Sequence, residues 1–279
     1  MRKLDFVKAQ GIGNDFIMVD ARSAQLDLAR LPDLAVRLCN RNYGIGGDGL
    51  ILIHPSTSAD YRMQIINSDG SEAEMCGNGI RCFAAYLRQR ESVAQTVSIE
   101  TLAGVKTVEI QEYGGSVSFT VNMGAPALDA RDIPINGFEG RVISQTLDVD
   151  GTTYRVTCVS MGNPHCVIFT DSVSNVPLAQ VGPKIENHPA FPRKTNVEFV
   201  QVTSPEEITF RVWERGAGVT LACGTGACAA VVAGVLNDKL ARKVKVHLPG
   251  GDLVIDWRED GNVYMTGPAE EVFTGTIGI

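Results

Sequence analysis

Apolar residues recur every three or four positions in segments 31–42 and 80–90, and they fill segment 227–236 completely. The first two patterns predict amphipathic helices, and Pro32 stands where the first turn of a helix accepts proline. The third pattern predicts a helix buried on all sides, because its whole surface is apolar. Short runs of β-branched and aromatic residues predict the strands of the first half, at 6–9, 16–19, 50–53, 61–66, 97–101, 106–110 and 117–121.

The two halves of the chain repeat one pattern. The tetrapeptides at 76–79 and 223–226 share a Cys-Gly-x-Gly signature 147 residues apart, and the same offset aligns Asn40 with Asn187. An offset that holds over many positions indicates a duplicated unit rather than a chance match. The sequence therefore predicts two similar domains.

Together these patterns predict an α+β fold with two pseudo-symmetric domains. We expect each domain to be a curved, mixed but mostly antiparallel sheet wrapped around one central helix. The first domain is expected at residues 1–121, joined by the C-terminal segment 268–279, which crosses back by the same internal symmetry. The second domain is expected at 122–267.

The composition excludes several classes of function. A chain of 279 residues with 44% hydrophobic residues is typical of a globular protein, and a net charge of −7 without a basic run argues against nucleic-acid binding. The longest apolar stretch is too short to span a membrane. The first ten residues lack the apolar run of a signal peptide, so we expect a cytoplasmic protein. Seven cysteines, an odd number, then do not predict a disulfide framework.

Each Cys-Gly-x-Gly segment precedes an apolar helix, and the free N–H groups at a helix start can bind an anion. A cysteine at that place has its thiolate favoured by the helix dipole, by about 0.3–1 kcal/mol and by ~2 kcal/mol when partly buried. This stabilisation corresponds to roughly one pKa unit below a reference near 8.5. We therefore expect Cys76 and Cys223 to be chemically active, with both thiol and thiolate accessible near neutral pH.

Three other interpretations of the cysteines were weighed. A buried cysteine usually acts as a small hydrophobic residue, which we expect for Cys39, Cys82, Cys158, Cys166 and Cys228. A zinc or iron–sulfur site is disfavoured, because neither Cys-x2-Cys nor His-x3–5-His spacing occurs, and no metal is predicted. A disulfide between Cys76 and Cys223 would require oxidation.

Two glycine-rich segments suggest a nucleotide site, and both matches are weak. Segment 44–49 matches G-x-G-x-x-G but follows a predicted helix and precedes a strand, the reverse of the required order. Segment 224–229 opens a helix after a strand, but no acidic residue ends the next strand to bind a ribose. A nucleotide-binding oxidoreductase therefore stays an alternative, as does a non-catalytic binding module for an anionic metabolite.

Two equivalent cysteines related by a pseudo-twofold axis suit the stereoinversion of a small carboxylate-bearing substrate. A thiolate can remove the proton from one face of an α-carbon while a thiol on the opposite face donates one. Backbone N–H groups of segments 77–79 and 224–226 would bind the carboxylate and stabilise the carbanion. No pyridoxal-phosphate signature occurs, so the predicted mechanism uses no cofactor.

On these segments the chain resembles the diaminopimelate epimerase family from end to end. The matching segments are 11–16 (GIGNDF), 67–71 (NSDGS), 76–82 (CGNGIRC), 162–165 (GNPH), 195–197 (TNV), 214–216 (ERG) and 222–226 (ACGTG). The resemblance implies interconversion of LL- and meso-2,6-diaminopimelate, a late step of lysine biosynthesis that also supplies peptidoglycan. It further implies a homodimer and a cofactor-independent, two-base mechanism with Cys76 and Cys223 as the catalytic pair.

The same resemblance assigns roles to individual residues. Glu214 would accept a hydrogen bond from the reacting α-ammonium, and His165 would orient or polarise a thiol. Glu214 occupies the repeat position of Asn67, so the symmetry is broken where the two ends of the substrate are distinguished. The residues expected to bind substrate are Asn14, Asn67, Gly77, Asn78, Asn163, Asn196, Glu214, Arg215, Gly224 and Thr225.

One position departs from the family pattern. Many members carry glutamine where this chain has Gly49, so no role is assigned to that position. The nearest alternative function is a racemase or epimerase of another amino acid, such as proline or hydroxyproline, on a related two-cysteine scaffold. Arg215 and the asparagine set suit a zwitterion at the distal end of the substrate, and this favours diaminopimelate.

Overall fold

The computed structural model describes residues 2–24 and 26–279. Its contacts divide the chain into two compact units, the first made of Met1–Asn122 with Thr266–Ile279 and the second of Met123–Met265. Strands β8 and β17 carry the chain from one unit into the other.

In the first unit the strands pair in the order β18–β1–β2–β3–β4–β6–β7–β8. Neighbours are antiparallel except β2–β3 and β4–β6, which are parallel, and the short β5 pairs with β4. The elements are β1 (Lys3–Gly11), β2 (Asn14–Asp20), a 3-10 helix (Leu28–Arg30), α1 (Leu31–Cys39), β3 (Gly49–His54), β4 (Tyr61–Asn67), β5 (Glu72–Ala73), α2 (Gly77–Arg90), β6 (Thr96–Thr101), β7 (Gly104–Tyr113), β8 (Ser116–Gly124) and β18 (Glu270–Gly278).

In the second unit the strands pair in the order β9–β10–β11–β12–β13–β15–β16. Pairs β11–β12 and β13–β15 are parallel, and the short β14 pairs with β13. The elements are β9 (Gln145–Val149), β10 (Thr152–Ser160), β11 (Pro164–Phe169), a 3-10 helix (Val173–Asn175), α3 (Leu178–Glu186), β12 (Asn196–Ser204), β13 (Glu207–Glu214), β14 (Gly218–Val219), α4 (Gly224–Leu236), β15 (Lys243–Leu248), β16 (Gly251–Trp257) and β17 (Val263–Gly267).

The two units repeat the same connections. Helices α1 and α3 each link the first parallel pair of their unit, and α2 and α4 each link the second. A parallel pair needs such a crossover. The antiparallel neighbours are joined by short connections, except β18 and β1, which lie at the two ends of the chain. The predicted α+β fold with two pseudo-symmetric halves is therefore confirmed.

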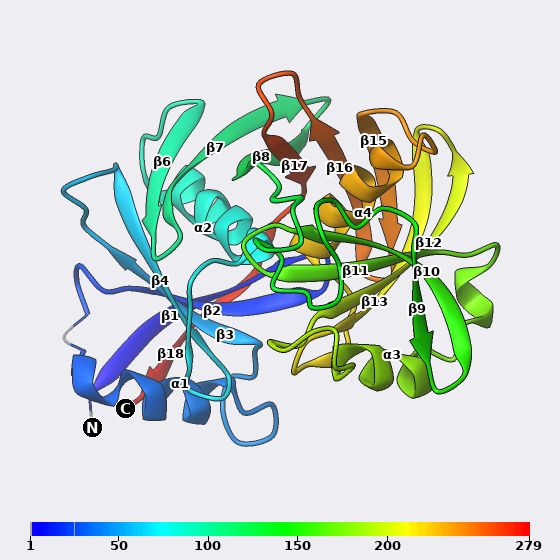
Figure 1. The fold of residues 1–279 in the computed structure, drawn as a ribbon. Helices are drawn as coiled ribbons and strands as arrows, with labels where there is room; N and C mark the ends of the chain where they lie inside the picture. The colour runs from blue at the N-terminus through cyan, green and yellow to red at the C-terminus, as the bar shows by residue number, and fades with distance from the viewer. Residues whose placement is uncertain (1, 25) are drawn as a thin grey trace. The chain divides into compact units, whose positions relative to one another are not determined.

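Helices α2 and α4 are the central helices of their units. Every residue of α2 from Gly77 to Leu87 is buried, and in Figure 1 the helix lies within the curve of β4, β6 and β7. The buried charge of this helix, Arg81, is satisfied: its guanidinium donates to the carbonyl oxygens of Gly77 and Pro268 and to Oδ1 of Asn78. Arg81 therefore holds the start of α2 in place.

Helix α1 is shorter than the sequence pattern predicts. It ends at Cys39 rather than Asn42, because Asn40 is extended and its Oδ1 accepts hydrogen bonds from the backbone N–H groups of Asn42 and Tyr43. An asparagine side chain that bonds the backbone in this way competes with the helix. Within the described ranges, no helix is long and apolar enough to cross a membrane.

Candidate active site

Cys76 and Cys223 occupy the same structural position, directly before the central helix of each unit. Cys76 is the N-cap of α2, and its Sγ accepts a hydrogen bond from the N–H of Gly79 at 3.4 Å. Cys223 is the N-cap of α4 and accepts from the N–H of Gly226 at 3.3 Å. In both places the sulfur replaces the oxygen of a usual N-cap residue and satisfies an amide that has no partner within the helix.

The central helices begin earlier than the sequence pattern predicts. The predicted starts were residues 80 and 227, whereas α2 begins at Gly77 and α4 at Gly224. Hydrophobic periodicity starts only at the first apolar residue, but the cysteine cap draws the preceding glycines into the first helical turn. The glycine-rich segments are therefore the helix starts themselves, with backbone N–H groups available to a ligand.

Gly79 and Gly226 are required by close packing around the two thiols. A Cβ on Gly79 would lie 3.0 Å from Cδ1 of Ile51. A Cβ on Gly226 would lie 2.9 Å from Oε1 of Glu198 and 3.0 Å from Sγ of Cys223. A side chain at 226 would therefore occupy the space next to a carboxyl group and a thiol at once.

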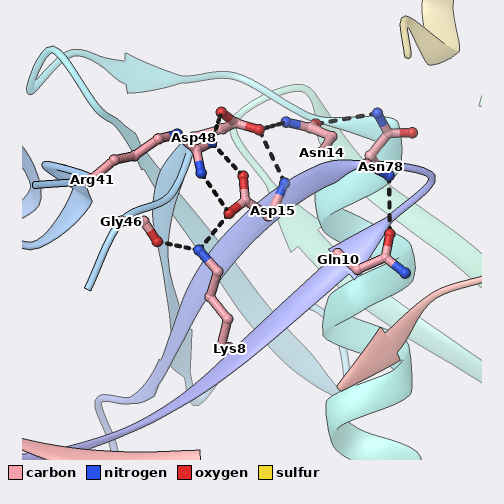
Figure 2. Close-up of polar contacts among 9 residues, drawn as sticks. Lys8, Gln10, Asn14, Asp15, Arg41, Gly46, Asp48 and Asn78 are labelled. Atoms are coloured by element: carbon pink, nitrogen blue, oxygen red, sulfur yellow. Dashed lines mark hydrogen bonds and ion pairs between the residues drawn. The ribbon is translucent and has the colours of Figure 1, made fainter. Parts of the chain in front are cut away.

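Asn14 lies beside Cys76 in the first unit. Its Oδ1 accepts hydrogen bonds from the Cys76 thiol, at a sulfur–oxygen distance of 3.7 Å, and from Nδ2 of Asn78 at 3.1 Å. Its Nδ2 donates to Oδ2 of Asp48 at 2.5 Å, as Figure 2 shows. An ionised carboxylate only accepts hydrogen bonds, so Asp48 fixes the amide with its oxygen toward the thiol.

Asp48 belongs to a cluster of charged residues behind this amide (Figure 2). It accepts from Arg41 at 2.8 Å and from the backbone N–H of Asp15 at 3.0 Å. Asp15 in turn contacts Arg41 at 2.6 Å and Lys8 at 2.5 Å. Burial alone would raise the pKa of Asp15, but hydrogen bonds from Arg41 and Lys8 outweigh it and lower this pKa to about 2. The cluster therefore keeps Asp15 ionised and connects it to Asp48.

Asn67 ends β4 and pairs with Gly49 across the sheet. Its Nδ2 donates to Oγ of Ser71 at 3.0 Å. Gly49 is buried, and a Cβ there would lie 3.1 Å from the carbonyl oxygen of Ile66. A glutamine at position 49 would therefore require this strand pair to shift.

In the second unit a series of close polar contacts leads from Cys223 to a buried carboxyl group. Sγ of Cys223 lies 3.6 Å from Oγ1 of Thr225, which accepts from Nδ2 of Asn163 at 3.4 Å. Oδ1 of Asn163 lies 3.0 Å from Nε2 of His165, and Nδ1 of His165 lies 2.6 Å from Oε1 of Glu198. The structure thus brings four of the predicted site residues together and adds Glu198.

The side chain of Asn196 is hydrogen-bonded to the backbone N–H of Arg215. The Asn196 side chain is buried, donates to the carbonyl oxygen of Pro164 at 2.9 Å and accepts from the Arg215 N–H at 2.9 Å. The exposed Arg215 guanidinium donates to the carbonyl oxygen of Arg193 at 3.2 Å. Asn196 therefore supports the backbone of Arg215, whose cationic group faces solvent.

The electrostatics around Cys223 differ from the expectation for a capped thiol. Burial raises the pKa of Cys223 well above its usual value, and the nearby Glu214 raises it further. Burial also raises the pKa of Glu214, although a hydrogen bond from the Thr220 hydroxyl opposes this. A helix dipole contributes only about 1 kcal/mol, which does not offset desolvation together with the Glu214 carboxyl group. The expectation of a Cys223 pKa near neutrality is therefore wrong in this structure.

Asp48 and Glu198 were not among the predicted site residues. Glu198 is the one charge in the otherwise apolar run 197–200, and an isolated carboxyl in such a strand signals a special environment. Asp48 lies in the glycine-rich segment 44–49, and nothing local in the sequence indicates that its partner is Asn14.

The cysteines of the described chain are free thiols. Cys76 is half-buried and the other six cysteines are buried, and none of the seven forms a disulfide in the described chain. Among residues 2–24 and 26–279, no group of three or more histidine, cysteine, aspartate or glutamate side chains is placed to hold a metal ion.

The chain is similar to known proteins along most of its length. The model of the diaminopimelate epimerase family matches residues 6–128 and 157–272. A diaminopimelate epimerase from Pelotomaculum thermopropionicum is 57% identical over 274 residues, covering 98% of each chain. One from Heliobacterium modesticaldum is 56% identical over 279 residues, covering 98% of this chain and 99% of the relative.

Solved structures share the fold at much lower sequence identity. A PhzF-family phenazine biosynthesis protein from Bacillus anthracis gives a TM-score of 0.74 with 16% identity, covering both chains completely. A hydroxyproline epimerase from Agrobacterium vitis, solved with bound trans-4-hydroxy-L-proline, gives a TM-score of 0.70 with 14% identity, covering 99% of this chain and 91% of that one. At these identities the likeness shows the fold alone.

Proposed function

The chain belongs to the diaminopimelate epimerase family, a family of isomerases, and from this premise we propose that it interconverts LL- and meso-2,6-diaminopimelate. The observation that carries the proposal is the family match across both units, each of which contains a cysteine-capped central helix. The reaction would serve lysine and peptidoglycan precursor biosynthesis.

The proposed mechanism uses Cys76 and Cys223 as two bases. The thiolate of one cysteine takes the α-proton and becomes a thiol, which leaves a carbanion on the α-carbon. The thiol of the other cysteine gives its proton to the opposite face and becomes a thiolate. Protons and charge balance without a cofactor, and the reverse reaction exchanges the two roles.

The helix starts supply the electrostatic stabilisation in this proposal. Backbone N–H groups at the starts of α2 and α4 would bind the substrate carboxylate and stabilise the negative charge that develops next to it. Glu214 would accept from the α-ammonium group, and His165 would orient or polarise a thiol. The residues proposed to hold the substrate are Asn14, Asn67, Gly77, Asn78, Asn163, Asn196, Arg215, Gly224 and Thr225.

The family resemblance also supports a homodimer that acts in the cytoplasm on a small molecule and has no nucleic-acid partner. Analytical ultracentrifugation tests the oligomeric part of this proposal. A mass of two chains supports it, and a mass of one chain at micromolar concentration contradicts it.

A substrate comparison tests the proposed activity. The purified chain is incubated separately with LL-diaminopimelate, L-proline and trans-4-hydroxy-L-proline, without added cofactor, and the stereoisomers are separated by chiral chromatography. We expect meso-diaminopimelate from the first substrate and no inversion of the other two. Inversion of proline or hydroxyproline alone would favour the alternative racemase, and dependence on nicotinamide would favour an oxidoreductase.

A further inference from the structure

Glu198 is a buried carboxyl group that the two-base mechanism does not use. It lies in β12, and both its side chain and that of His165 are completely buried. Its Oε1 lies 2.6 Å from Nδ1 of His165, whereas its Oε2 is buried and has no hydrogen-bond partner. A buried polar oxygen without a donor is uncommon in proteins and calls for a physical explanation.

The contacts of His165 determine how many protons the pair holds. Nδ2 of Asn163 donates to Thr225, so Oδ1 of Asn163 faces Nε2 of His165 as an acceptor at 3.0 Å. Nε2 therefore carries a hydrogen. The short contact between Nδ1 and Oε1 then needs one further proton, carried either by the ring, as an ion pair, or by Glu198, as a neutral acid beside a neutral imidazole.

The unpartnered Oε2 decides between these two states. In the ion pair, a charged carboxylate oxygen would be buried without a donor, which is strongly unfavourable because the ion has lost its hydration. In the neutral state, Oε2 is only a carbonyl oxygen, and leaving it without a donor costs much less. Burial acts in the same direction, because it raises the pKa of Glu198 and outweighs the opposing effects of His165 and of the backbone N–H groups of Cys166 and Glu198.

We propose that Glu198 is a positioning residue that stays protonated, donates to Nδ1 of a neutral His165 and keeps this side of Cys223 uncharged. This inference rests on the proposed function, since it assigns Cys223 a thiolate during the reaction. The hydrogen bond fixes the ring with its remaining hydrogen on Nε2 and thereby orients Asn163 and Thr225 toward the sulfur.

Glu198 and the Cys223 thiol both lie next to Gly226. The site of its absent Cβ is 2.9 Å from Oε1 of Glu198 and 3.0 Å from Sγ of Cys223, so position 226 places no side chain between the two groups. A negative charge on Glu198 would oppose ionisation of the thiol, and a neutral acid does not. The other titratable groups that interact with the Glu198–His165 pair are Glu214 and Cys166.

The test uses two variants of Glu198. Glu198→Gln retains a donor for Nδ1 and a carbonyl oxygen, as the protonated acid does, whereas Glu198→Leu retains neither. We expect Glu198→Leu to lower kcat/KM by about 100-fold. We expect Glu198→Gln to keep kcat/KM within about tenfold of the wild-type value. Loss of activity in the Gln variant as large as in the Leu variant, with both folded by circular dichroism, would overturn the proposal.

Two spectroscopic measurements report the proton directly and do not depend on activity. At neutral pH, infrared difference spectra should show the carbonyl band of a protonated carboxylic acid that Glu198→Gln removes. The matched control is Glu186→Gln, because Glu186 is also buried but its oxygens accept from Trp213 and Gly216, so this variant should keep the band. In the wild type, ¹⁵N spectra should show His165 as the neutral tautomer with hydrogen on Nε2.

An imidazolium signal from His165, with no acid band lost in Glu198→Gln, would overturn the proposal. Failure of the proposed function would give a different set of results from failure of this inference. A chain without epimerase activity that still shows the acid band and the neutral ring would disprove diaminopimelate epimerisation and leave the protonation of Glu198 standing.

Discussion

Oδ1 of Asn14 faces the thiol of Cys76 at 3.7 Å, with the Asn14 amide held in that orientation by the carboxylate of Asp48. A carbonyl oxygen next to sulfur stabilises the thiol through the S–H hydrogen bond and offers nothing to the thiolate. In the second unit, burial raises the pKa of Cys223, and Glu214 raises it further. The Cys223 thiol is therefore set to hold its proton in the substrate-free protein.

Asp48→Ala removes the acceptor that fixes the Asn14 amide. Only the hydrogen bond from Nδ2 of Asn78 then holds the amide. When this bond breaks, the amide can turn its Nδ2 toward the sulfur and donate to a thiolate, so we expect the alkylation rate of Cys76 at neutral pH to rise about fivefold. We expect kcat/KM to fall about tenfold, because the amide no longer has one orientation. Iodoacetamide labelling followed by mass spectrometry measures the first effect. Asp15→Asn, which leaves Asp48 in place, is the control, and an equal effect in both variants would contradict this role of Asp48.

The two proposed catalytic thiols should react at different rates in the substrate-free protein. Cys76 is half-buried, whereas Cys223 is 5% exposed and its pKa is raised mainly by burial. We expect iodoacetamide to modify Cys76 at least about tenfold faster than Cys223 at pH 7. Peptide mapping over time measures both rates, with urea-unfolded protein as the control for equal intrinsic reactivity. Faster labelling of Cys223 would show that its environment is wrongly described.

Asp15 should contribute acid-sensitive stability. Its folded-state pKa of about 2 lies below the usual aspartate value of 3.8, so its contribution is complete above the unfolded pKa and is lost as the pH falls from 3.8 through 2. The shift corresponds to about 2 kcal/mol at neutral pH. Asp15→Asn should therefore lower the free energy of unfolding by about 2 kcal/mol at pH 7 and by little below pH 2.

Urea unfolding across this pH range measures the contribution of Asp15. Asp129→Asn is the control, since Asp129 pairs with Arg131 on the surface and its loss should change stability little. A difference between wild type and Asp15→Asn that stays constant from pH 7 to pH 2 would contradict the assigned pKa.

Gly226→Ala should damage activity more than Gly79→Ala. The new Cβ at 226 meets a carboxyl oxygen and the Cys223 sulfur, whereas the nearest atom at 79 is a methyl group of Ile51, which can rotate away. We expect about 100-fold loss of kcat/KM for the first variant and about tenfold for the second. Alanine also gains up to ~1 kcal/mol of helix propensity in both, so thermal unfolding alone will not reproduce this order. Equal losses of activity would contradict the packing argument.

Local sequence patterns were sufficient for the fold class and for the two cysteine segments. The Cys-Gly-x-Gly signature and the apolar run after it lie within one stretch of chain, so they could be recognised without knowing any distant contact. The repeat then extended the prediction from one unit to the other. The helix starts were misplaced by three residues, because periodicity does not detect a cap made by sulfur.

The environment of each thiol could not be predicted in the same way. Glu198 reaches His165 across 33 residues of sequence, and Asp48 reaches Asn14 across 34. Both contacts depend on parallel strand pairs, β11–β12 and β2–β3, whose register no local pattern specifies. The burial that raises the pKa of Cys223 arises from the same long-range packing.

Deuterium exchange in variants that each replace one of the two proposed catalytic cysteines tests the two-base mechanism most directly. The wild type, Cys76→Ala and Cys223→Ala are incubated with LL-diaminopimelate in D₂O without added cofactor, and deuterium at the α-carbon and the ratio of stereoisomers are measured by mass spectrometry and chiral separation. The two-thiol mechanism predicts that the wild type incorporates deuterium at one α-carbon while forming the meso isomer. It predicts that neither variant epimerises the substrate, and full activity in either one would contradict it.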